Sequence, residues 1–398
     1  MEKRNVYLDY SATTPVKDEV LEKMIPYFTQ NFGNPSSLYT IGQESKQAIA
    51  EAREQVAALI GAEPREIFFT SSGTEADNWA VIEGAESRLK RGNHVISSKI
   101  EHHALLHSLE YLEKRGYSVT RLDVDGDGFV SPDALESAIT DRTTLISVMY
   151  ANNEIGTIQP IAEIAGIAKR HGILFHTDAV QALGNLRIDV RALGVDMLSV
   201  SAHKIYGPKG IGALYVRKGV LLPSHMHGGA QENKKRAGTE NLAGIVGFGK
   251  AAELAMRDLD AHVERVGALR DYFVGRVREA IPDVRINGSL ERRLPGNANI
   301  TFEYIEGEAL LLLLDLDGIS VSTGSACSSA SLTPSHVLTA LGVPVEMIHG
   351  SLRFTIGDFT AKEDIDYTVE SLVKNVEKLR SISSVSREKG WHANGDVQ

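Results

Sequence analysis

Short apolar runs alternate with amphipathic stretches over most of the 398 residues of this chain. Such alternation is typical of a mainly parallel β-sheet wrapped by helices. Seven runs are predicted to be its strands: Glu66–Thr70, His94–Ser97, Ser118–Leu122, Thr144–Met149, Leu174–His176, Met197–Ser201 and Gly212–Val216. We therefore expect an α/β fold built on a seven-stranded, mainly parallel sheet.

The alternation fades near Leu259, which suggests a second unit. A charged amphipathic helix is predicted over Ala261–Ile281, and a final helix over Ala361–Leu379. Shorter strands are predicted at Ala298–Phe302, Ile319–Ser322 and Leu352–Thr355. We expect a large domain over residues 16–258 and a smaller α+β domain over 259–380. An N-terminal segment, 1–15, is expected to join the small domain, and 381–398 to form a loose tail.

Composition excludes several classes of protein. Apolar residues make up 42% and charged residues 24%, as in ordinary globular proteins. The net charge of −10 argues against nucleic acid or an anionic membrane as a partner, and no apolar run is long enough to span a bilayer. The single cysteine rules out an internal disulfide and a Cys-rich metal site. We expect a cytoplasmic protein.

Two strand ends carry the strongest chemical signal. Asp178 ends one apolar run, and Lys204 follows the next. Ligands collect at the carboxyl ends of strands in such sheets, so an acid and a lysine placed there face one pocket. An amine beside a carboxylate, hydroxyls and an imidazole suits pyridoxal phosphate, whose aldehyde the lysine holds and whose ring nitrogen the acid holds. The alternative is a surface lysine near an unrelated strand-end acid.

Two segments are candidates for an anion site. Thr70–Ala76 follows a strand and opens a helix, and its hydroxyls, glycine and free amides could bind phosphate. A plain N-cap with Glu75 near the helix start explains it equally well. A second Gly-rich loop extends from Gly228 to Asn241 and either completes an anion site or is a solvated turn.

Two further motifs have competing explanations. His102, just past a strand, could stack on a flat cofactor and move a proton. The lack of a second ligand cluster with suitable spacing argues against a metal site. Asp123–Gly128 begins like a calcium-binding loop, but the twelfth position is Ala134 instead of a glutamate. We expect an acidic turn before a helix that begins near Ser131.

Two residues of the C-terminal part suggest chemistry. Cys327 lies among small, mostly hydroxylated residues, which describes an exposed loop in which a thiol can react. The alternative is a small buried hydrophobe. Arg353, between apolar residues of a strand, needs a partner, and either a substrate carboxylate or a protein acid would serve.

In these motifs the chain resembles the pyridoxal-phosphate-dependent cysteine desulfurases of the iron–sulfur-cluster assembly type, within the class V aminotransferases. The resemblance extends from Tyr7–Pro15 through Asn31–Ser37 and Asn152–Gly156 to about Thr360. It implies the fold type I of pyridoxal-phosphate enzymes and a homodimer. The length of the segment around Cys327 is similar to that of the long-loop subgroup.

The resemblance also implies a role for each matching residue. Lys204 holds the cofactor aldehyde, Asp178 the pyridine nitrogen and Gln181 the ring hydroxyl oxygen, while His102 stacks on the ring. The phosphate ligands are Gly73, Thr74, Ser201 and His203, with Thr239 reaching in from the second subunit. The substrate carboxylate is held by Asn34, Asn153 and Arg353, and Asn153 also touches the cofactor. Cys327 accepts the sulfur, with a transient contact to a cluster as a further possibility; no metal ligands are implied.

The implied reaction removes sulfur from L-cysteine, leaving L-alanine and a persulfide on Cys327 for an acceptor such as an iron–sulfur scaffold. A selenocysteine lyase or another class V aminotransferase is the alternative enzyme, and a catalytically idle sulfur-transfer scaffold is the alternative from another class. His103 and Ala202 stand where lysine and glycine are common in the family. The ending Trp391–Gln398 does not resemble the family's scaffold-docking segment, which puts that partner in doubt.

Overall fold

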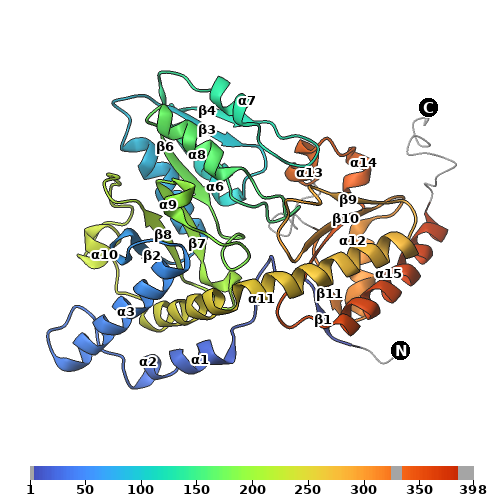
Figure 1. Cartoon of the computed structure of the whole chain (residues 1–398), viewed down its shortest axis with the longest axis horizontal. Helices are drawn as coiled ribbons and strands as arrows, with labels where there is room; N and C mark the ends of the chain where they lie inside the picture. The colour runs from blue at the N-terminus through green and yellow to red at the C-terminus, as the bar shows by residue number, and fades with distance from the viewer. Residues whose placement is uncertain (1–3, 324–333, 384–398) are drawn as a thin grey trace.

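A seven-stranded sheet forms the centre of the larger part of the molecule (Figure 1). The computed structural model describes residues 4–323 and 334–383. In spatial order the strands are β2 (Ile67–Thr70), β8 (Gly212–Val216), β7 (Met197–Ser201), β6 (Leu174–Asp178), β5 (Thr143–Ser147), β3 (His94–Ser98) and β4 (Ser118–Leu122). β8 pairs antiparallel with both its neighbours, and the other pairs are parallel. The predicted seven-stranded, mainly parallel sheet is confirmed.

The apolar runs of the sequence become strands because both faces of the sheet are covered. Within β6, Leu174 packs into the core on one face and Phe175 into the core on the other. Met197 and Leu198 divide in the same way in β7. Strands buried on both faces lack the alternation of polar and apolar residues and read as continuous apolar runs.

Helices cover the two faces of this sheet. They are α3 (Thr40–Leu59), α4 (Gly73–Asn78), α5 (Gly84–Glu86), α6 (His103–Lys114), α7 (Pro132–Ser137), α8 (Ile161–Arg170) and α9 (Val190–Leu193). Shorter helices α1 (Asp18–Met24), α2 (Pro26–Thr29) and α10 (Gln231–Lys234) lie outside this layer. The predicted acidic turn is confirmed: Asp125 Oδ1 accepts from the backbone amides of Asp127 and Phe129, and Ser131 caps α7.

One long helix, α11 (Leu242–Ala280), connects the two parts of the molecule (Figure 1). The prediction that this helix begins at Ala261 was wrong. Its true start is marked by Asn241, whose side chain accepts from the Gly244 amide over 3.1 Å. The first turns of α11, residues 242–252, are largely buried between α1 and α3, so apolar residues and glycines surround the helix axis there and show no amphipathic period. The helix runs through residue 258, and a domain boundary there stays a prediction.

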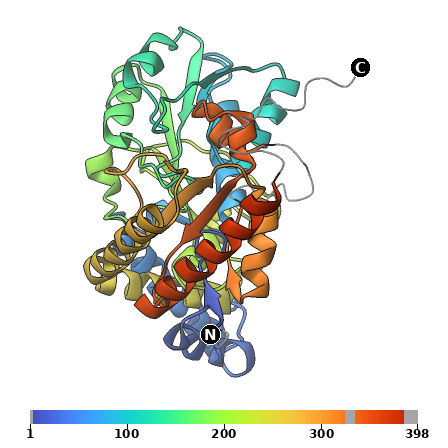
Figure 2. The ribbon, with the colours of Figure 1, turned by 90° about the vertical axis from the view of Figure 1, so that its right-hand side faces the viewer.

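The C-terminal part is a small antiparallel sheet with helices on it. Its strands lie in the order β12 (Ser351–Thr355), β10 (Asn297–Phe302) and β9 (Val284–Asn287), and β1 (Val6–Tyr7) pairs with β11 (Ile319–Ser320). Its helices are α12 (Gly307–Leu316), α13 (His336–Ala340), α14 (Val345–Ile348) and α15 (Lys362–Ile382). Figure 2 shows α11 and α15 side by side over this part. The predicted α+β character is confirmed, although β9 was not predicted.

Among the helices in residues 4–323 and 334–383, none combines the length and the apolar character that crossing a membrane requires.

Candidate active site

A cavity of about 290 Å³ opens where the carboxyl ends of β6 and β7 meet the starts of α4 and α6. The small sheet closes it from one side through Arg353 of β12. The cavity brings together ten residues predicted for one site: Gly73, Thr74, His102, Asn153, Asp178, Gln181, Ser201, His203, Lys204 and Arg353. Residues far apart in the sequence thus form one pocket, as the strand-end argument predicts.

Lys204 and Asp178 lie on neighbouring strand ends. Lys204 ends a short 3₁₀ turn after β7, and its Nζ donates to the carbonyl oxygens of Ser11 and of Ala12, the latter at 2.8 Å. Asp178, the last residue of β6, accepts from the Val180 amide over 2.9 Å. Burial raises the pKa of Asp178 to about 6, although the Val180 amide and the Lys204 charge act against that rise. The carboxyl is therefore mostly ionised at neutral pH.

One end of the cavity is shaped to receive an anion. Within the described chain, the buried Ser201 hydroxyl has no hydrogen-bond partner, so it can still bond to a ligand. Gly73 opens α4, and a Cβ there would stand 2.6 Å from Val180 Cγ2, so only glycine allows this close approach. Ser72 caps α4 by accepting from the Glu75 amide over 3.1 Å. The N-cap explanation and the anion-site explanation are thus compatible.

His102 caps helix α6 with its ring. Nδ1 accepts from the Ala104 amide over 3.1 Å, so the proton of the neutral ring sits on Nε2. Burial, together with the positive charge of Lys204, lowers the pKa of His102 to about 4. The ring is therefore neutral at physiological pH and offers an N–H to the cavity.

Arg353 already has a protein acid as a partner. Its Nη2 donates to Asp9 Oδ1 over 2.8 Å, and its Nη1 donates to the Asn153 carbonyl over 3.0 Å. Of the two sequence alternatives, pairing with a protein acid is observed. Its Nε is buried without a hydrogen-bond partner among the described residues, which leaves one donor for a ligand. A contact to the substrate carboxylate stays a prediction.

Three predicted residues do not line this cavity. Asn34 is exposed, and its Oδ1 accepts from the Ser36 amide over 2.9 Å. Thr239 is also exposed, after helix α10. Cys327 lies outside the described residues. The roles predicted for these three residues stay predictions.

Several polar residues of the pocket are not predicted from the sequence. Asp77 and Glu101 line the cavity and are buried; burial raises the pKa of Glu101 to about 8 and holds that of Asp77 well above its ordinary value. Asp77 could have been noticed, because Ala80 and Val81 follow it at helical spacing on a buried face. His336 gives no such signal, yet its Nε2 donates to the Glu101 carbonyl over 3.0 Å.

Within residues 4–323 and 334–383, no group of three or more His, Cys, Asp or Glu side chains is arranged to hold a metal ion. The arrangement instead provides an amine, a buried carboxylate, a neutral imidazole and an anion cradle around one space.

Comparison with known proteins gives consistent results. Residues 6–368 match the aminotransferase class-V family. The cysteine desulfurase IscS of Dictyoglomus turgidum is 55% identical over 392 residues, covering 98% of this chain and 99% of the relative. IscS of Methanosarcina thermophila is 56% identical over 385 residues, covering 97% and 95%. A solved NifS-like protein is 38% identical with a TM-score of 0.89, covering 94% of this chain and 100% of that one. SspA, solved in complex with cysteine, is 38% identical with a TM-score of 0.79, covering 89% and 100%.

Proposed function

The chain belongs to the class-V aminotransferase family, it is a pyridoxal-phosphate-dependent cysteine desulfurase, and we propose that the cavity beside Lys204 is its active site. The observation that carries this proposal is the meeting of three features in one pocket. They are the Lys204 amine, the buried Asp178 carboxyl one strand away, and the unpartnered Ser201 hydroxyl.

The residues present fit the cofactor. Lys204 would hold its aldehyde, and the ionised Asp178 would hold the proton on its ring nitrogen. Its phosphate would lie in the cradle of Gly73 and the Ser201 hydroxyl, with Thr74 and His203 beside it. His102 would cover one face of the ring, and Gln181 and Asn153 would bond to its edge. When bound, pyridoxal phosphate supplies an aldehyde for the substrate amine and a ring that takes up electrons from it.

We assign proton transfer to two side chains. The Lys204 amine is held by two backbone carbonyl oxygens, which leaves it close to Asp178 and the cavity. We assign it removal of the substrate Cα proton. His102 is assigned the proton transfer at the substrate thiol, because its neutral ring carries a proton on Nε2 that it can donate to the sulfur. The free Nε of Arg353 and the side chain of Asn153 are assigned the substrate carboxylate.

Cys327 is assigned the sulfur. It is the single cysteine of the chain, so a protein persulfide can form nowhere else. In this step the bond between Cβ and sulfur of the substrate breaks and a bond forms between that sulfur and Cys327 Sγ. The proton removed from Cα returns there and the proton given up by the Cys327 thiol goes to Cβ, so cysteine and the enzyme thiol give alanine and an enzyme persulfide. A solved relative, SspA, holds cysteine, which supports cysteine as the ligand.

We further propose a homodimer that hands its sulfur to an acceptor protein such as an iron–sulfur scaffold. Large apolar side chains are exposed along the N-terminal helices and the loop after them: Leu21, Ile25, Phe28, Phe32, Leu38 and Tyr39. Leu38 is 93% exposed. A single chain would leave this patch in water, whereas a second copy would bury it. Asn34 belongs to the same loop, so dimerisation would give Asn34 a route to a neighbouring site, and the role proposed for Thr239 likewise depends on a second subunit.

The direct test is product analysis. Purified protein reconstituted with pyridoxal phosphate is given L-cysteine and a thiol reductant, and alanine and sulfide are measured. Equal amounts of both products are expected. Sulfide without alanine would show β-elimination and overturn the proposed sulfur transfer to Cys327. Ultracentrifugation of the same sample tests the dimer, with Phe32→Ser and Leu38→Ser expected to weaken it.

A further inference from the structure

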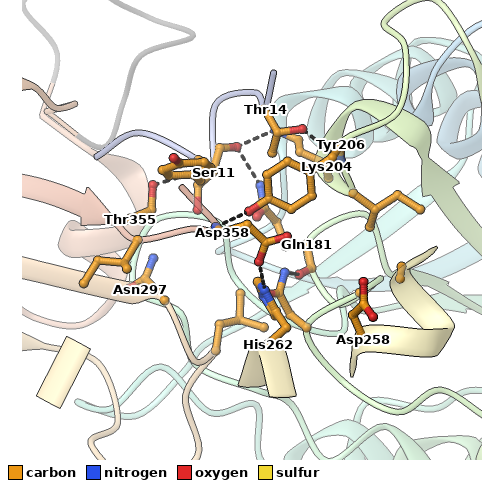
Figure 3. A pocket seen from close by; sticks show the side chains of 18 of the residues that line it. Ser11, Thr14, Gln181, Lys204, Tyr206, Asp258, His262, Asn297, Thr355 and Asp358 are labelled. Carbon is orange, nitrogen blue, oxygen red and sulfur yellow. Dashed lines mark hydrogen bonds and ion pairs between the residues drawn. The ribbon is translucent and has the colours of Figure 1, made fainter. Parts of the chain in front are cut away.

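A second, smaller cavity of about 50 Å³ lies beside the active site and shares Ser11, Gln181 and Lys204 with it. Its other walls come from helix α11 and from the residues after β12 (Figure 3). A space of this size holds a few water molecules. Titratable side chains of Lys17, Asp258, His262 and Asp358 line it, so it is a polar junction between the two parts of the molecule.

His262 of α11 makes two hydrogen bonds at this junction. Its Nδ1 lies 2.6 Å from Asp358 Oδ1, and its Nε2 lies 3.2 Å from Asn185 Oδ1. The amide nitrogen of Asn185 donates to the Gln181 carbonyl over 3.1 Å. If the Asn185 side-chain amide were rotated by 180°, its oxygen would face the Gln181 carbonyl oxygen and the two would repel each other. Asn185 Oδ1 must therefore face His262. Both ring nitrogens therefore meet acceptors, and only the positively charged imidazolium donates from both.

The partner of this cation is a fixed carboxylate. Besides His262, Asp358 contacts Lys17 Nζ at 2.6 Å and Arg265 Nη2 at 3.6 Å. Burial acts to raise the pKa of Asp358, but the hydrogen bonds from His262 and Lys17 outweigh it and hold that pKa well below its ordinary value. The backbone amide of Asp358 also donates to the Tyr206 hydroxyl over 2.6 Å. Asp358 is therefore ionised and held from both its side chain and its backbone (Figure 3).

Through its Nε2 contact with Asn185, His262 is connected to the active site by further hydrogen bonds. Asn185 bonds the backbone carbonyl of Gln181, and Gln181 Nε2 donates to the Ser11 carbonyl over 2.9 Å. The same Ser11 oxygen accepts from Lys204 Nζ. A continuous path of hydrogen bonds thus runs from Asp358 of the small part, through α11, to the lysine proposed to hold the cofactor.

We propose that His262, in its imidazolium form, is a positioning residue for sulfur removal: it fixes Asn185, and through it the turn that presents Gln181 to the cofactor and to Ser11. This inference rests on the roles proposed for Gln181 and Lys204. His262 touches neither substrate nor cofactor, so its effect reaches the reaction through the geometry of residues 179–187.

The test uses the holoenzyme and two variants that break the path at different points. His262→Gln cannot donate from both ends, and Asn185→Leu keeps the pair of His262 and Asp358 but removes the link to Gln181. Hydrogen exchange followed by mass spectrometry should show faster exchange over residues 179–187 in both. The dissociation constant of pyridoxal phosphate should rise about fivefold to tenfold in each. In the double variant, this dissociation constant should be no higher than in the weaker-binding single variant, because both substitutions break the same hydrogen-bond path.

Asp271→Asn is the matched control, since it breaks a 2.7 Å ion pair with Arg270 on the same helix α11, and neither residue belongs to the segment 179–187. It should change none of these readouts. A ¹⁵N NMR spectrum of histidine-labelled protein should contain a ring whose two nitrogens both take part in hydrogen bonds, and this signal should be missing from His262→Gln.

Unchanged exchange over residues 179–187 in both variants would overturn the inference, as would additive losses in the double variant. Faster exchange with unchanged cofactor affinity and turnover would overturn it as well. If His262→Gln fails to fold, Asn185→Leu carries the test. The exchange and NMR readouts do not depend on the role of Lys204, so failure of the proposed active site would leave them intact.

Discussion

The Ser335 hydroxyl donates to Glu154 Oε2 over 2.6 Å, and both side chains are buried. Glu154 lines the active-site cavity next to Asn153, and Ser335 lies just beyond the residues that contain Cys327. The bond therefore fixes the chain that follows the proposed sulfur acceptor to the wall of the cavity in which the sulfur is released.

Ser335→Ala should lower both the stability and the rate of persulfide formation while the cofactor stays bound. The change leaves a buried carboxylate oxygen without its donor, at a cost of about 1–3 kcal/mol beyond the loss of the α13 cap. Ser131→Ala is the matched control because Ser131 caps α7 at the same 3.2 Å but has no second buried partner. Denaturant unfolding and single-turnover persulfide assays would measure both effects. Equal losses in the two variants would mean that the Glu154 bond contributes nothing.

Lys204→Ala should abolish both the covalent attachment of pyridoxal phosphate and alanine formation. No other lysine lines the active-site cavity in the described chain, so no second amine can replace it. The neighbouring Lys209, which donates to the Thr14 carbonyl over 3.4 Å, provides the control: Lys209→Ala should keep the visible absorbance and the turnover. Borohydride reduction followed by peptide mapping locates the attachment. A reduced adduct on any lysine other than Lys204 would contradict the assignment.

Asp178→Asn should stabilise the cofactor-free protein at neutral pH although it removes turnover. The pKa of Asp178 is raised from 3.8 to about 6 by burial, so the folded state binds the proton more tightly than the unfolded state. The free energy of unfolding then falls by about 3 kcal/mol as the pH rises from about 4 to 6. Asparagine does not ionise, so the variant avoids this loss. Chemical unfolding at pH 7 should show the gain, and unfolding at pH 3.5 should show none. A gain of equal size at both pH values would argue against this cause.

His102→Ala and Thr74→Ala should separate catalysis from cofactor binding. The His102 ring supplies the Nε2 proton, so its loss should mainly lower kcat. Thr74 lies at the anion end of the cavity, so its loss should mainly raise the dissociation constant of pyridoxal phosphate. Because burial keeps the pKa of His102 near 4, wild-type turnover should show no loss between pH 5 and 8 from its protonation. If His102→Ala mainly weakened cofactor binding and Thr74→Ala mainly lowered kcat, the roles assigned to the two residues would have to be exchanged.

The sequence predicts the parts of this protein in which local pattern and final environment agree. β6 and β7 were found because strands buried on both faces are apolar throughout, and Asp178 and Lys204 stand out because polar residues follow those runs directly. The first turns of α11, residues 242–252, were missed for a related reason: they are largely buried on all sides, so their sequence carries no helical period.

Partners that meet only in the folded state could not be predicted. The sequence shows that Arg353 needs an acid but does not identify Asp9, which lies more than three hundred residues away. The contacts of Ser335 with Glu154 and of His262 with Asn185 are of the same kind, since each joins segments from different parts of the fold. Local residue pattern reports burial and turn chemistry, whereas such pairs depend on how the strands and α11 are arranged.

Cys327→Ser should leave the fold and the bound cofactor intact but nearly stop alanine release from cysteine. A hydroxyl is too poor a nucleophile toward sulfur to form a persulfide, because it does not ionise at neutral pH as a thiol does. Mass spectrometry after cysteine treatment without reductant should find one added, reducible sulfur on the Cys327 peptide of the wild type. Since the chain has a single cysteine, the variant should carry no such adduct anywhere. Alanine release at the normal rate in Cys327→Ser would show that sulfur leaves without a protein acceptor.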